Sequence, residues 1–314
     1  MGRYIARKAA WLVLVLLGVA VLTFLMGRLA PGDPVETLLS SVPNPTQEDR
    51  QQAEAYLGLN LPLPAQFAVW VGRIVRGDLG VSYKTGRAVA REMGIRLPTT
   101  LRLTGGATCV MLLFGFSIGI LSAAYRGKWV DHLARVLNVV AISVPSFCFG
   151  ILLILFFGVR LKLLPTMGNE TLAHMILPSL AMGIGSGAGL ARLLRVQLAT
   201  AAAQEHVQAA KVFGVSPYRI FFNHVLKNAL PPVLTQIGLM IGAMLGGSAI
   251  IETLFTLPGA GSYIVEAIAG RDYPVIQAYA LLMAAVYVCM NTLIDIAHAL
   301  MNPAARTLEG YHEA

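Results

Sequence analysis

The chain has 314 residues, of which 56% are hydrophobic and only 13% charged, and its formal net charge is +8. A mean hydropathy of +0.67 means more apolar surface than a soluble domain can cover, which excludes an ordinary globular protein. Excess positive charge in a membrane protein gathers in short cytoplasmic loops, so it does not indicate nucleic-acid binding. We therefore expect membrane lipid as a partner and no nucleic acid.

The first predicted element is a transmembrane helix over Ala9–Leu29, which is long enough to cross the hydrocarbon core. Arg3, Arg7 and Lys8 precede it and predict a cytoplasmic N-terminus by the positive-inside rule. A cleaved signal peptide has a similar basic start, but no small-residue cleavage pattern follows this run. Residues 1–30 are therefore predicted to be the cytoplasmic N-terminus and the first transmembrane helix.

Residues 31–97 have a different, polar composition that is rich in proline. Amphipathic pieces around Gln47–Leu57 and Pro64–Arg76 indicate that this segment folds. Long translocated segments escape the positive-inside rule, so its arginines are compatible with an external position. We expect a folded external segment on the periplasmic side.

A core of five further transmembrane helices is expected over residues 98–303, and a cytoplasmic tail over 304–314. Short segments assigned to the cytoplasm are rich in Lys and Arg, and the external ones are near neutral, so both termini are predicted to be cytoplasmic. The fold class expected is an all-α integral membrane protein with six transmembrane helices. The five further spans are Leu101–Tyr125, Leu133–Val159, Leu172–Leu194, Leu230–Phe255 and Ile276–Met301.

Glycines alternate with small or apolar residues within the span Leu172–Leu194, at Gly183, Gly185, Gly187 and Gly189. Small residues allow helix backbones to approach closely in a membrane. Two interpretations remain open, a helix that lines a solute pathway and ordinary tight helix packing.

The cysteines lie inside apolar runs, at Cys109, Cys148 and Cys289. Their spacing fits neither a disulfide framework nor a Cys-based zinc site, so no metal site is expected from them. They are interpreted as small packing residues.

Residues 200–228, between the fourth and fifth spans, are too polar to enter lipid but rich in helix-forming residues. Ala201–Val212 favours a surface helix, Gly214 is a natural left-handed stop, and Ser216 followed by Pro217 starts a second helix. Small alanine side chains leave a shallow face over which another protein can close. A docking helix and an unspecialised interfacial helix are both compatible with this pattern.

After the fifth span, Pro258 with Gly259 and Gly261 is expected to break the helix at the outer boundary. Exposed backbone groups are tolerated there if they line a wet cavity. A simple turn between helices is the alternative interpretation.

Two acidic residues lie in or at the end of predicted spans, Glu252 and Asp295. An ionisable residue inside a span is a functional candidate by default. Both are therefore kept as pathway or structural charges, with pairing to a basic residue as the structural alternative for Asp295.

The segment from Glu205 to Gly214, followed by Leu230, Pro231 and Pro232, resembles the cytoplasmic loop of bacterial ABC-importer permeases. In that family the loop is the coupling helix, which sits in a cleft of the ATPase subunit. His206 and Val207 depart from the usual Glu-Ala-Ala core, as is common in the peptide and nickel branch. The resemblance gives the ATPase-coupling role to Glu205, His206, Ala209, Ala210 and Gly214.

This resemblance, to the dipeptide/oligopeptide/nickel permeases, runs along nearly the whole chain. It implies the type I ABC-importer permease fold and an external scoop over residues 256–275, with Pro258, Gly259, Gly261 and Asp272. Asn302 stands where the family usually has Asp. The other matching segments are Arg28–Pro34, Gly77–Ser82, Pro98–Leu103, Ser143–Phe147 and Asp272–Gln277.

An ATP-binding loop is not found, because Asp33 follows the glycines Gly27 and Gly32 where a lysine is required. The chain is therefore not expected to be an enzyme or to hold a cofactor. The resemblance implies two partner ATPase subunits that bind ATP and Mg, a second homologous permease subunit and an external substrate-binding protein. It also implies a multi-pass protein of the inner (plasma) membrane.

The solute is expected to be nickel or a metal chelate, because Gly80–Thr85 and Arg271–Gln277 look most like nickel permeases. A dipeptide or oligopeptide importer of the same family is the alternative. The histidines are scattered, so no metal ligation by this chain is expected.

Two other classes compete with the importer. A self-contained secondary transporter or channel would need a coupling-ion site or filter near the midplane, and the spans carry little charge for one. A membrane-embedded metalloprotease would need paired His and acidic ligands, and no His-Glu-x-x-His pattern occurs.

Overall fold

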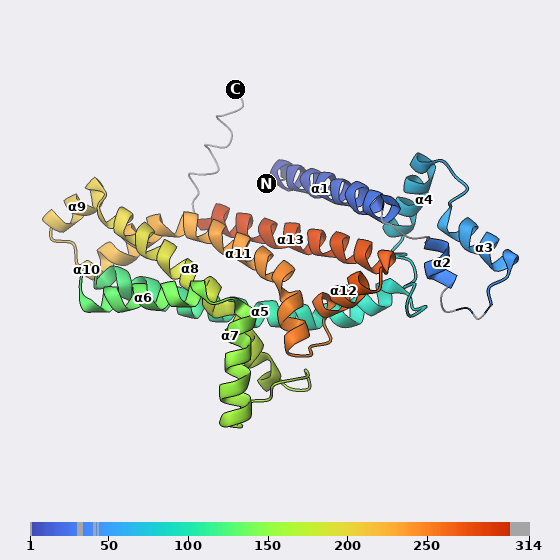
Figure 1. Ribbon diagram of the computed structural model, residues 1–314. Helices are drawn as coiled ribbons and strands as arrows, with labels where there is room; N and C mark the ends of the chain where they lie inside the picture. Colours follow the sequence, from blue (N-terminus) through green and yellow to red (C-terminus); the bar gives the residue numbers. More distant parts are fainter. Residues whose placement is uncertain (1, 30–33, 40–41, 43, 302–314) are drawn as a thin grey trace. The chain divides into compact units, whose positions relative to one another are not determined.

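The computed structural model describes residues 2–29, 34–39, 42 and 44–301. These residues are almost entirely helical (Figure 1), with one isolated antiparallel bridge between Val81 and Ala88. The chain divides into two compact units, which are described separately. Unit 1 comprises Met1–Thr100 and Pro258–Val288, and unit 2 comprises Leu101–Leu257 and Cys289–Ala314.

Unit 1 contains the first helix, the segment after it and the region around residue 270. Its elements are α1 (Gly2–Leu29), α2 (Pro34–Leu39), α3 (Gln47–Leu57), α4 (Leu63–Val75), the start of α5 (Val89–Ala124), α12 (Ala260–Ala269) and most of α13 (Tyr273–Met301).

Unit 2 contains the remainder of α5 and α13 and the helices between them. These are α6 (Trp129–Ser143), α7 (Ser146–Leu153), the π-helical η1 (Ile154–Arg160), the 3₁₀ turn η2 (Leu172–Met175), α8 (Ile176–Ala202), α9 (Glu205–Val212), α10 (Pro217–Ile220), the π-helical η3 (Phe221–Leu226) and α11 (Lys227–Leu254).

Five helical stretches of the described chain are long and apolar enough to cross a membrane, and a bent helix pair brings the number to six. The expected all-α membrane fold with an additional segment after the first helix is thus confirmed. The five stretches are Ala10–Leu29, Val89–Ala124, Leu172–Ala202, Pro217–Leu254 and Tyr273–Ile294.

The third span is not the single straight helix that was predicted over Leu133–Val159. The helices α6 and α7 meet at an angle of 100°, and α7 with η1 projects away from the rest of unit 2 (Figure 1). The ring of Pro145 disfavours helical backbone at the preceding residue, and Val144 accordingly takes φ −87° and ψ 119°. Hydropathy averaged over a window does not register this break.

The second helix of the cytoplasmic loop, which starts at Pro217, and the span Leu230–Phe255 were expected as separate elements. Instead, the chain is helical from Pro217 to Leu254, with Pro231 and Pro232 inside α11. Pro231 and Pro232 have no N–H group to donate to the carbonyl groups of Lys227 and Asn228, one turn earlier. The π-helical turns of η3, which are wider than α-helical turns, end immediately before these two residues. A local widening of the helix therefore accommodates the prolines without ending it.

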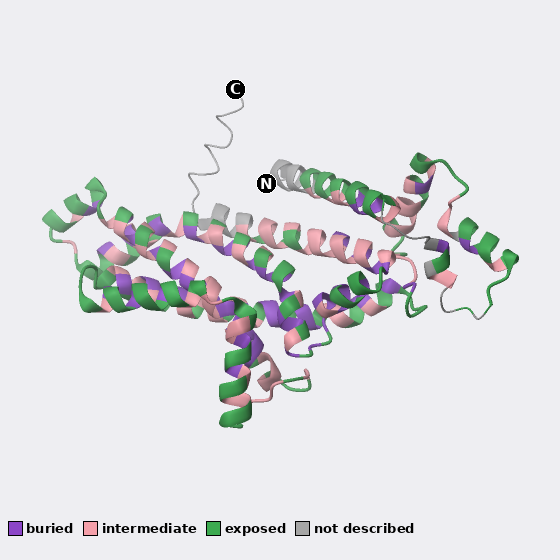
Figure 2. Ribbon diagram, in the orientation of Figure 1, coloured by how far each residue is buried: buried purple, intermediate pink, exposed green. Residues whose placement is uncertain are grey.

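The glycines of α8 make close contacts with α5. A Cβ atom at Gly183 would lie 2.6 Å from the carbonyl oxygen of Ala107, and one at Gly187 would lie 3.1 Å from that of Met111. Both positions are buried, as is much of α8 (Figure 2). These two glycines support the packing interpretation, because a larger residue would separate the helices.

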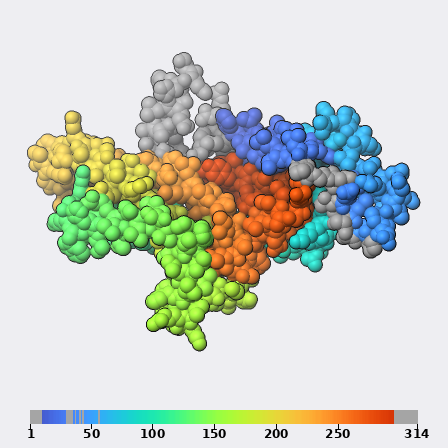
Figure 3. All heavy atoms as spheres, in the orientation of Figure 1, coloured from blue at the N-terminus to red at the C-terminus, as the bar shows by residue number. Residues whose placement is uncertain are grey.

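Apolar side chains cover much of the surface of α7 and η1. Leu152, Leu155 and Phe156 are each more than half exposed, and the space-filling view shows the projection that carries them (Figure 3). Exposed apolar side chains are normal where lipid or another membrane subunit is the neighbour.

Candidate functional site

Within residues 200–228, the segment predicted to be a cytoplasmic loop, the chain forms the short helix α9 followed by a tight turn. Gly214 has φ +75°, its amide donates to the carbonyl of Lys211 at 3.0 Å, and Val215 donates to Ala210 at 3.1 Å. This bond pair is typical of a helix that ends on a left-handed residue. The predicted role of Gly214 as a helix stop is confirmed.

The start of this helix differs from the prediction of one helix over Ala201–Val212. The helix α8 continues to Ala202, Gln204 is extended, and α9 begins at Glu205. Ser216 holds the N-cap position of α10 without a side-chain capping bond, and Pro217 occupies the first helical position as expected.

One face of α9 is anchored to the rest of unit 2. Val207 is completely buried. The Asn228 side-chain amide donates to Oε1 of Gln204 at 3.4 Å, and its nitrogen lies 3.2 Å from Nε2 of His206. Gln208 donates to the carbonyl of Ala202 at 2.7 Å. These bonds tie α9 both to the end of α8 and to the start of α11.

The opposite face of α9 is exposed together with the turn that follows it. Val212 is 85% exposed, Phe213 84% and Tyr218 74%. Glu205, His206, Ala209 and Gly214 are also exposed, and Ala210 is half-buried. Four of the five predicted coupling residues are thus accessible, on a segment that also exposes large apolar side chains.

The helix break after the fifth span lies before Pro258 and not at it. In unit 2, α11 ends at Leu254, Thr256 has φ +54°, and the Leu257 amide donates to the Glu252 carbonyl at 2.8 Å. This is again a left-handed helix end, but a β-branched residue occupies the position that favours glycine.

We expect Thr256→Gly to raise the free energy of unfolding by roughly 1 kcal/mol. A non-glycine residue in the left-handed region costs about 1–3 kcal/mol, and the extra freedom of glycine in the unfolded chain offsets only part of that relief. Thermal unfolding of the purified transporter would measure the change. Thr253→Gly, in the helical last turn of α11, is the control and is expected to destabilise.

In unit 1, Gly259 is the N-cap of α12, and Gly261 lies buried in its first turn. The amide of Ala260 donates to Oγ1 of Thr100 at 2.9 Å. Thr100 is itself completely buried on α5. Side-chain capping from α5 therefore satisfies one of the free amide groups at the start of α12.

Asp272 fastens the residues after α12 to the turn that precedes α5. Its buried carboxylate accepts hydrogen bonds from the Ser82 hydroxyl at 2.5 Å, the Tyr83 amide at 3.1 Å and the Lys84 amide at 3.5 Å. Arg271, immediately before it, has φ +53°. The structure thus gives Asp272 a clear positioning role within unit 1.

Tyr263 lies on the inner side of α12 and is 5% exposed. The Arg96 guanidinium lies 4.5 Å from the centre of its ring, a cation–π contact. Burial raises the pKa of the Tyr263 hydroxyl above its usual value. The contact adds a second attachment between α12 and α5.

Unit 2 contains a buried ion pair that no local sequence pattern indicated. Asp131 is 1% exposed and accepts two hydrogen bonds from Arg195, at 2.7 Å to Nε and 2.8 Å to Nη2. Ser122 donates at 2.6 Å and the Gly127 amide at 3.0 Å. The carboxylate therefore joins the end of α5, the start of α6 and α8.

Of the two acidic residues predicted in or near spans, the structure describes the side chain of only one. Glu252 is completely buried near the end of α11. Asp295 lies within α13, but its side chain is outside the part of the chain that the structure describes. Among the described side chains, no group of His, Cys, Asp or Glu has the size or geometry of a metal site.

A cavity of about 560 Å³ in unit 2 borders the bend between α6 and α7. Pro145 and Gly185 line it, together with Met244 and Gly247 of α11. Its walls are mostly apolar, and it has the volume of a small-molecule site. Gly185 thus faces a cavity, whereas Gly183 and Gly187 pack against α5.

The fold defines a multi-pass membrane protein with an anchored surface helix between two of its spans. Residues 115–307 match the family described as "Binding-protein-dependent transport system inner membrane component", and residues 1–104 match the N-terminal model of such membrane components. The chain belongs to this family, and it is a permease subunit of an ABC importer. Such subunits do not hydrolyse ATP, which a separate subunit does.

Individual proteins are similar over almost the full length of the chain. It is 37% identical to the glutathione transport system permease protein GsiC of Escherichia coli and 38% identical to that of Pectobacterium atrosepticum, each over 98% of this chain and 99% of the relative. A chain of the MetNI methionine ABC transporter, in an inward-facing conformation, has a TM-score of 0.56 and 16% identity, covering 67% of this chain and 96% of that one. The solved structure supports the type I importer permease fold.

Proposed function

We propose that this importer permease carries short peptides of the glutathione type and that α9 is its ATPase-coupling helix. The identity to glutathione permeases over 98% of the chain carries the substrate proposal. Glutathione is a small peptide, so these relatives favour the peptide alternative over the nickel or metal-chelate solute that the motifs suggested.

The exposed surface of α9 supports the coupling proposal. Large apolar residues outside the candidate spans are costly to leave in water, and Val212 and Phe213, on the same segment as Glu205, give a partner an apolar surface to cover. The proposed partners are two ATPase subunits that hold ATP and Mg, a second homologous permease and an external substrate-binding protein. The chain is proposed to lie in the inner membrane, with both termini on the cytoplasmic side.

The mechanism follows from the attachments of α9. ATP binding by the partner subunits would move the surface on which α9 rests. The link to α8 is a short one at Ala203 and Gln204, and Asn228 bonds α9 to the beginning of α11. A displacement of α9 therefore moves α8 and α11. This movement shifts the population between inward-open and outward-open states.

The substrate proposal is tested with the complete importer in proteoliposomes. Uptake of labelled glutathione, a dipeptide and Ni²⁺ would be measured with the binding protein present, together with ATP hydrolysis. We expect glutathione or the dipeptide to be taken up and to stimulate hydrolysis. Uptake of Ni²⁺ alone, with no response to either peptide, would restore the metal interpretation.

The coupling proposal predicts that Gly214→Leu lowers uptake at least tenfold. Among the described residues other than its chain neighbours, none has an atom within 4 Å of the position of a Cβ at Gly214, so the effect comes from backbone conformation and not from a clash. Leucine in the left-handed region costs roughly 1–2 kcal/mol and redirects the exposed turn. The readouts are uptake, ATP hydrolysis and the amount of ATPase that copurifies.

Gly214→Asn is the matched control, because asparagine tolerates the left-handed region. Uptake by this variant should stay within about twofold of the original protein. Equal uptake by the leucine and asparagine variants would contradict a coupling role for this turn.

A further inference from the structure

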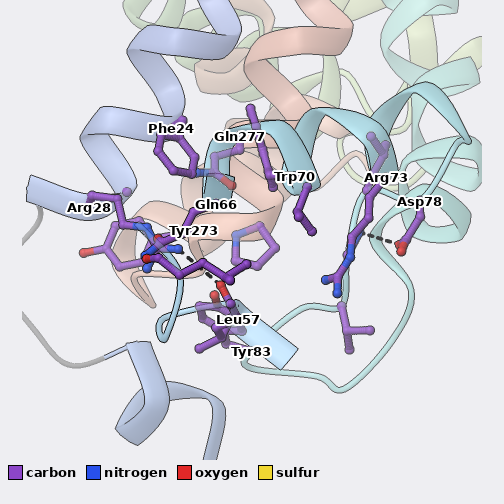
Figure 4. Close-up of a pocket in the computed structure, with 18 of the residues that line it drawn as sticks. Phe24, Arg28, Leu57, Gln66, Trp70, Arg73, Asp78, Tyr83, Tyr273 and Gln277 are labelled. Carbon is purple, nitrogen blue, oxygen red and sulfur yellow. Dashed lines mark hydrogen bonds between the residues drawn. The ribbon is translucent and has the colours of Figure 1, made fainter. Parts of the chain in front are cut away.

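A pocket in unit 1 lies beside the last turns of α1, at the end of that span farther from the N-terminus. It is lined by α1, the end of α3, α4, the turn before α5 and the start of α13 (Figure 4). Its volume is about 160 Å³. Pockets that enclose whole small-molecule ligands usually measure about 300–1,000 Å³, so this one suits a small polar group.

The pocket presents a cation from α1. Within the described part of the chain, the Arg28 guanidinium donates to the carbonyl of Leu57 at 3.3 Å and lies 5.4 Å from the ring centre of Phe24. A guanidinium has five N–H donors, so donors remain available for an anion. Its planar fork matches the oxygen atoms of a phosphate.

A buried hydrogen-bond acceptor lies in the same pocket. Gln66 is 8% exposed, and its Nε2 donates to the Leu61 carbonyl at 2.7 Å. This bond fixes the amide orientation, because only the nitrogen can donate. The described residues offer no donor to its Oε1 atom. A buried carbonyl oxygen favours a ligand that brings a donor.

Aromatic side chains with polar atoms also line this pocket. The aromatic residues Trp70, Tyr83 and Tyr273 line it, and such residues are enriched at the boundary between lipid and water. On the other side of α1, Met26 and Leu29 are 65% and 81% exposed. The end of α1 thus carries apolar surface outside the pocket that the acyl chains of a lipid can cover.

We propose that this pocket binds the headgroup of an aminophospholipid. The phosphodiester lies against Arg28, and the primary ammonium donates to Oε1 of Gln66. Asp78 and Arg73 also line the pocket, and the Asp78 carboxylate accepts a hydrogen bond from the Gly80 amide at 2.9 Å. The site ties α1 to α3 and α4 through a lipid, and it is independent of the solute that the importer carries.

The test compares phosphatidylethanolamine with phosphatidylcholine of identical acyl chains, because methylation removes every N–H donor of the headgroup. Native mass spectrometry of the delipidated importer complex would measure the lipid retained. We expect the ethanolamine lipid to bind about tenfold more tightly, the effect of a charge-assisted hydrogen bond to a buried group. Equal binding of both lipids would overturn the proposal.

Variants separate the two contacts. Gln66→Met should bring the two lipids within about twofold of each other, and Arg28→Gln should weaken both about tenfold, whereas Arg28→Lys should lose less. Arg76→Gln, on an exposed arginine that does not line the pocket, is the control and should change nothing. Thermal unfolding without added lipid shows whether each variant is folded.

Two further competition experiments distinguish a lipid from a soluble ligand. Free phosphoethanolamine, which lacks acyl chains, and glutathione would each be added to the lipid-loaded complex. We expect neither to displace the lipid at millimolar concentration. Displacement by phosphoethanolamine would assign the pocket to a soluble zwitterion, and displacement by glutathione would assign it to the transported peptide; either result overturns the lipid assignment.

Discussion

Asp131→Ala is expected to lower the free energy of unfolding by about 3–5 kcal/mol, the usual cost of leaving one member of a buried ion pair alone. The substitution removes the hydrogen bonds that this carboxylate accepts from Ser122, the Gly127 amide and Arg195. The Arg195 side chain is only 22% exposed, so water replaces little of what is lost. Thermal unfolding of the purified transporter measures the effect.

Two controls test the cause. The double variant Asp131→Ala with Arg195→Ala should cost clearly less than the sum of the single variants, because it leaves neither member of the buried pair alone. Glu36→Ala breaks a solvent-exposed pair with Arg50, at 3.7 Å, and should cost at most about 1 kcal/mol. Additive costs at Asp131 and Arg195 would show that the pair does not act as a unit.

The same pair bears on transport, because α8 leads directly into α9. If Asp131 and Arg195 hold the end of α8 rigidly against α5 and α6, their loss should reduce uptake more than basal ATP hydrolysis. We expect at least a tenfold fall in uptake for protein that remains assembled. A tenfold fall corresponds to a loss of about 1.4 kcal/mol in the free-energy coupling between α9 and the spans.

Asp272→Asn is expected to lower the free energy of unfolding of unit 1 by about 2–4 kcal/mol. The amide carries one acceptor oxygen in place of two and brings an NH₂ group toward the donors of Ser82 and Tyr83. A buried donor that loses its acceptor costs about 1–3 kcal/mol. Faster proteolysis of the turn between Val81 and Ala88 should accompany the loss, and uptake should fall.

Glu266→Gln is the matched control for this prediction, because Glu266 is an exposed acid on the neighbouring helix α12. Its stability and its proteolysis should be unchanged. Ser82→Ala removes the shortest bond to Asp272 and should give an intermediate loss, about 1–2 kcal/mol. An Asp272→Asn variant as stable as the original protein would show that the carboxylate does not hold this turn.

Much of the fold could be predicted because hydropathy is a property of consecutive residues. The first span was expected over Ala9–Leu29 and is found over Ala10–Leu29. Helix ends were predicted where one residue decides the backbone, as at Gly214, whose φ of +75° glycine adopts without strain. The left-handed helix end at Thr256 was not predicted, because a threonine side chain does not indicate a positive φ.

The internal breaks were less predictable, because proline has opposite effects at two places. Pro145 accompanies a 100° bend, whereas Pro231 and Pro232 lie inside a continuous helix. Whether a proline ends a helix depends on whether neighbouring turns widen and neighbouring helices pack to support it. That support is a property of the folded chain.

The sequence by itself determined that this is a helical membrane protein with several stretches apolar enough to cross lipid, and that a surface helix ends at the left-handed residue Gly214. These features depend on local composition and on single backbone preferences. Only the tertiary structure decided the partners of the buried acids: Arg195 is 64 residues from Asp131, and Ser82 is 190 residues from Asp272. Local patterns carry no information about contacts at such separations, because packing of the helices creates them.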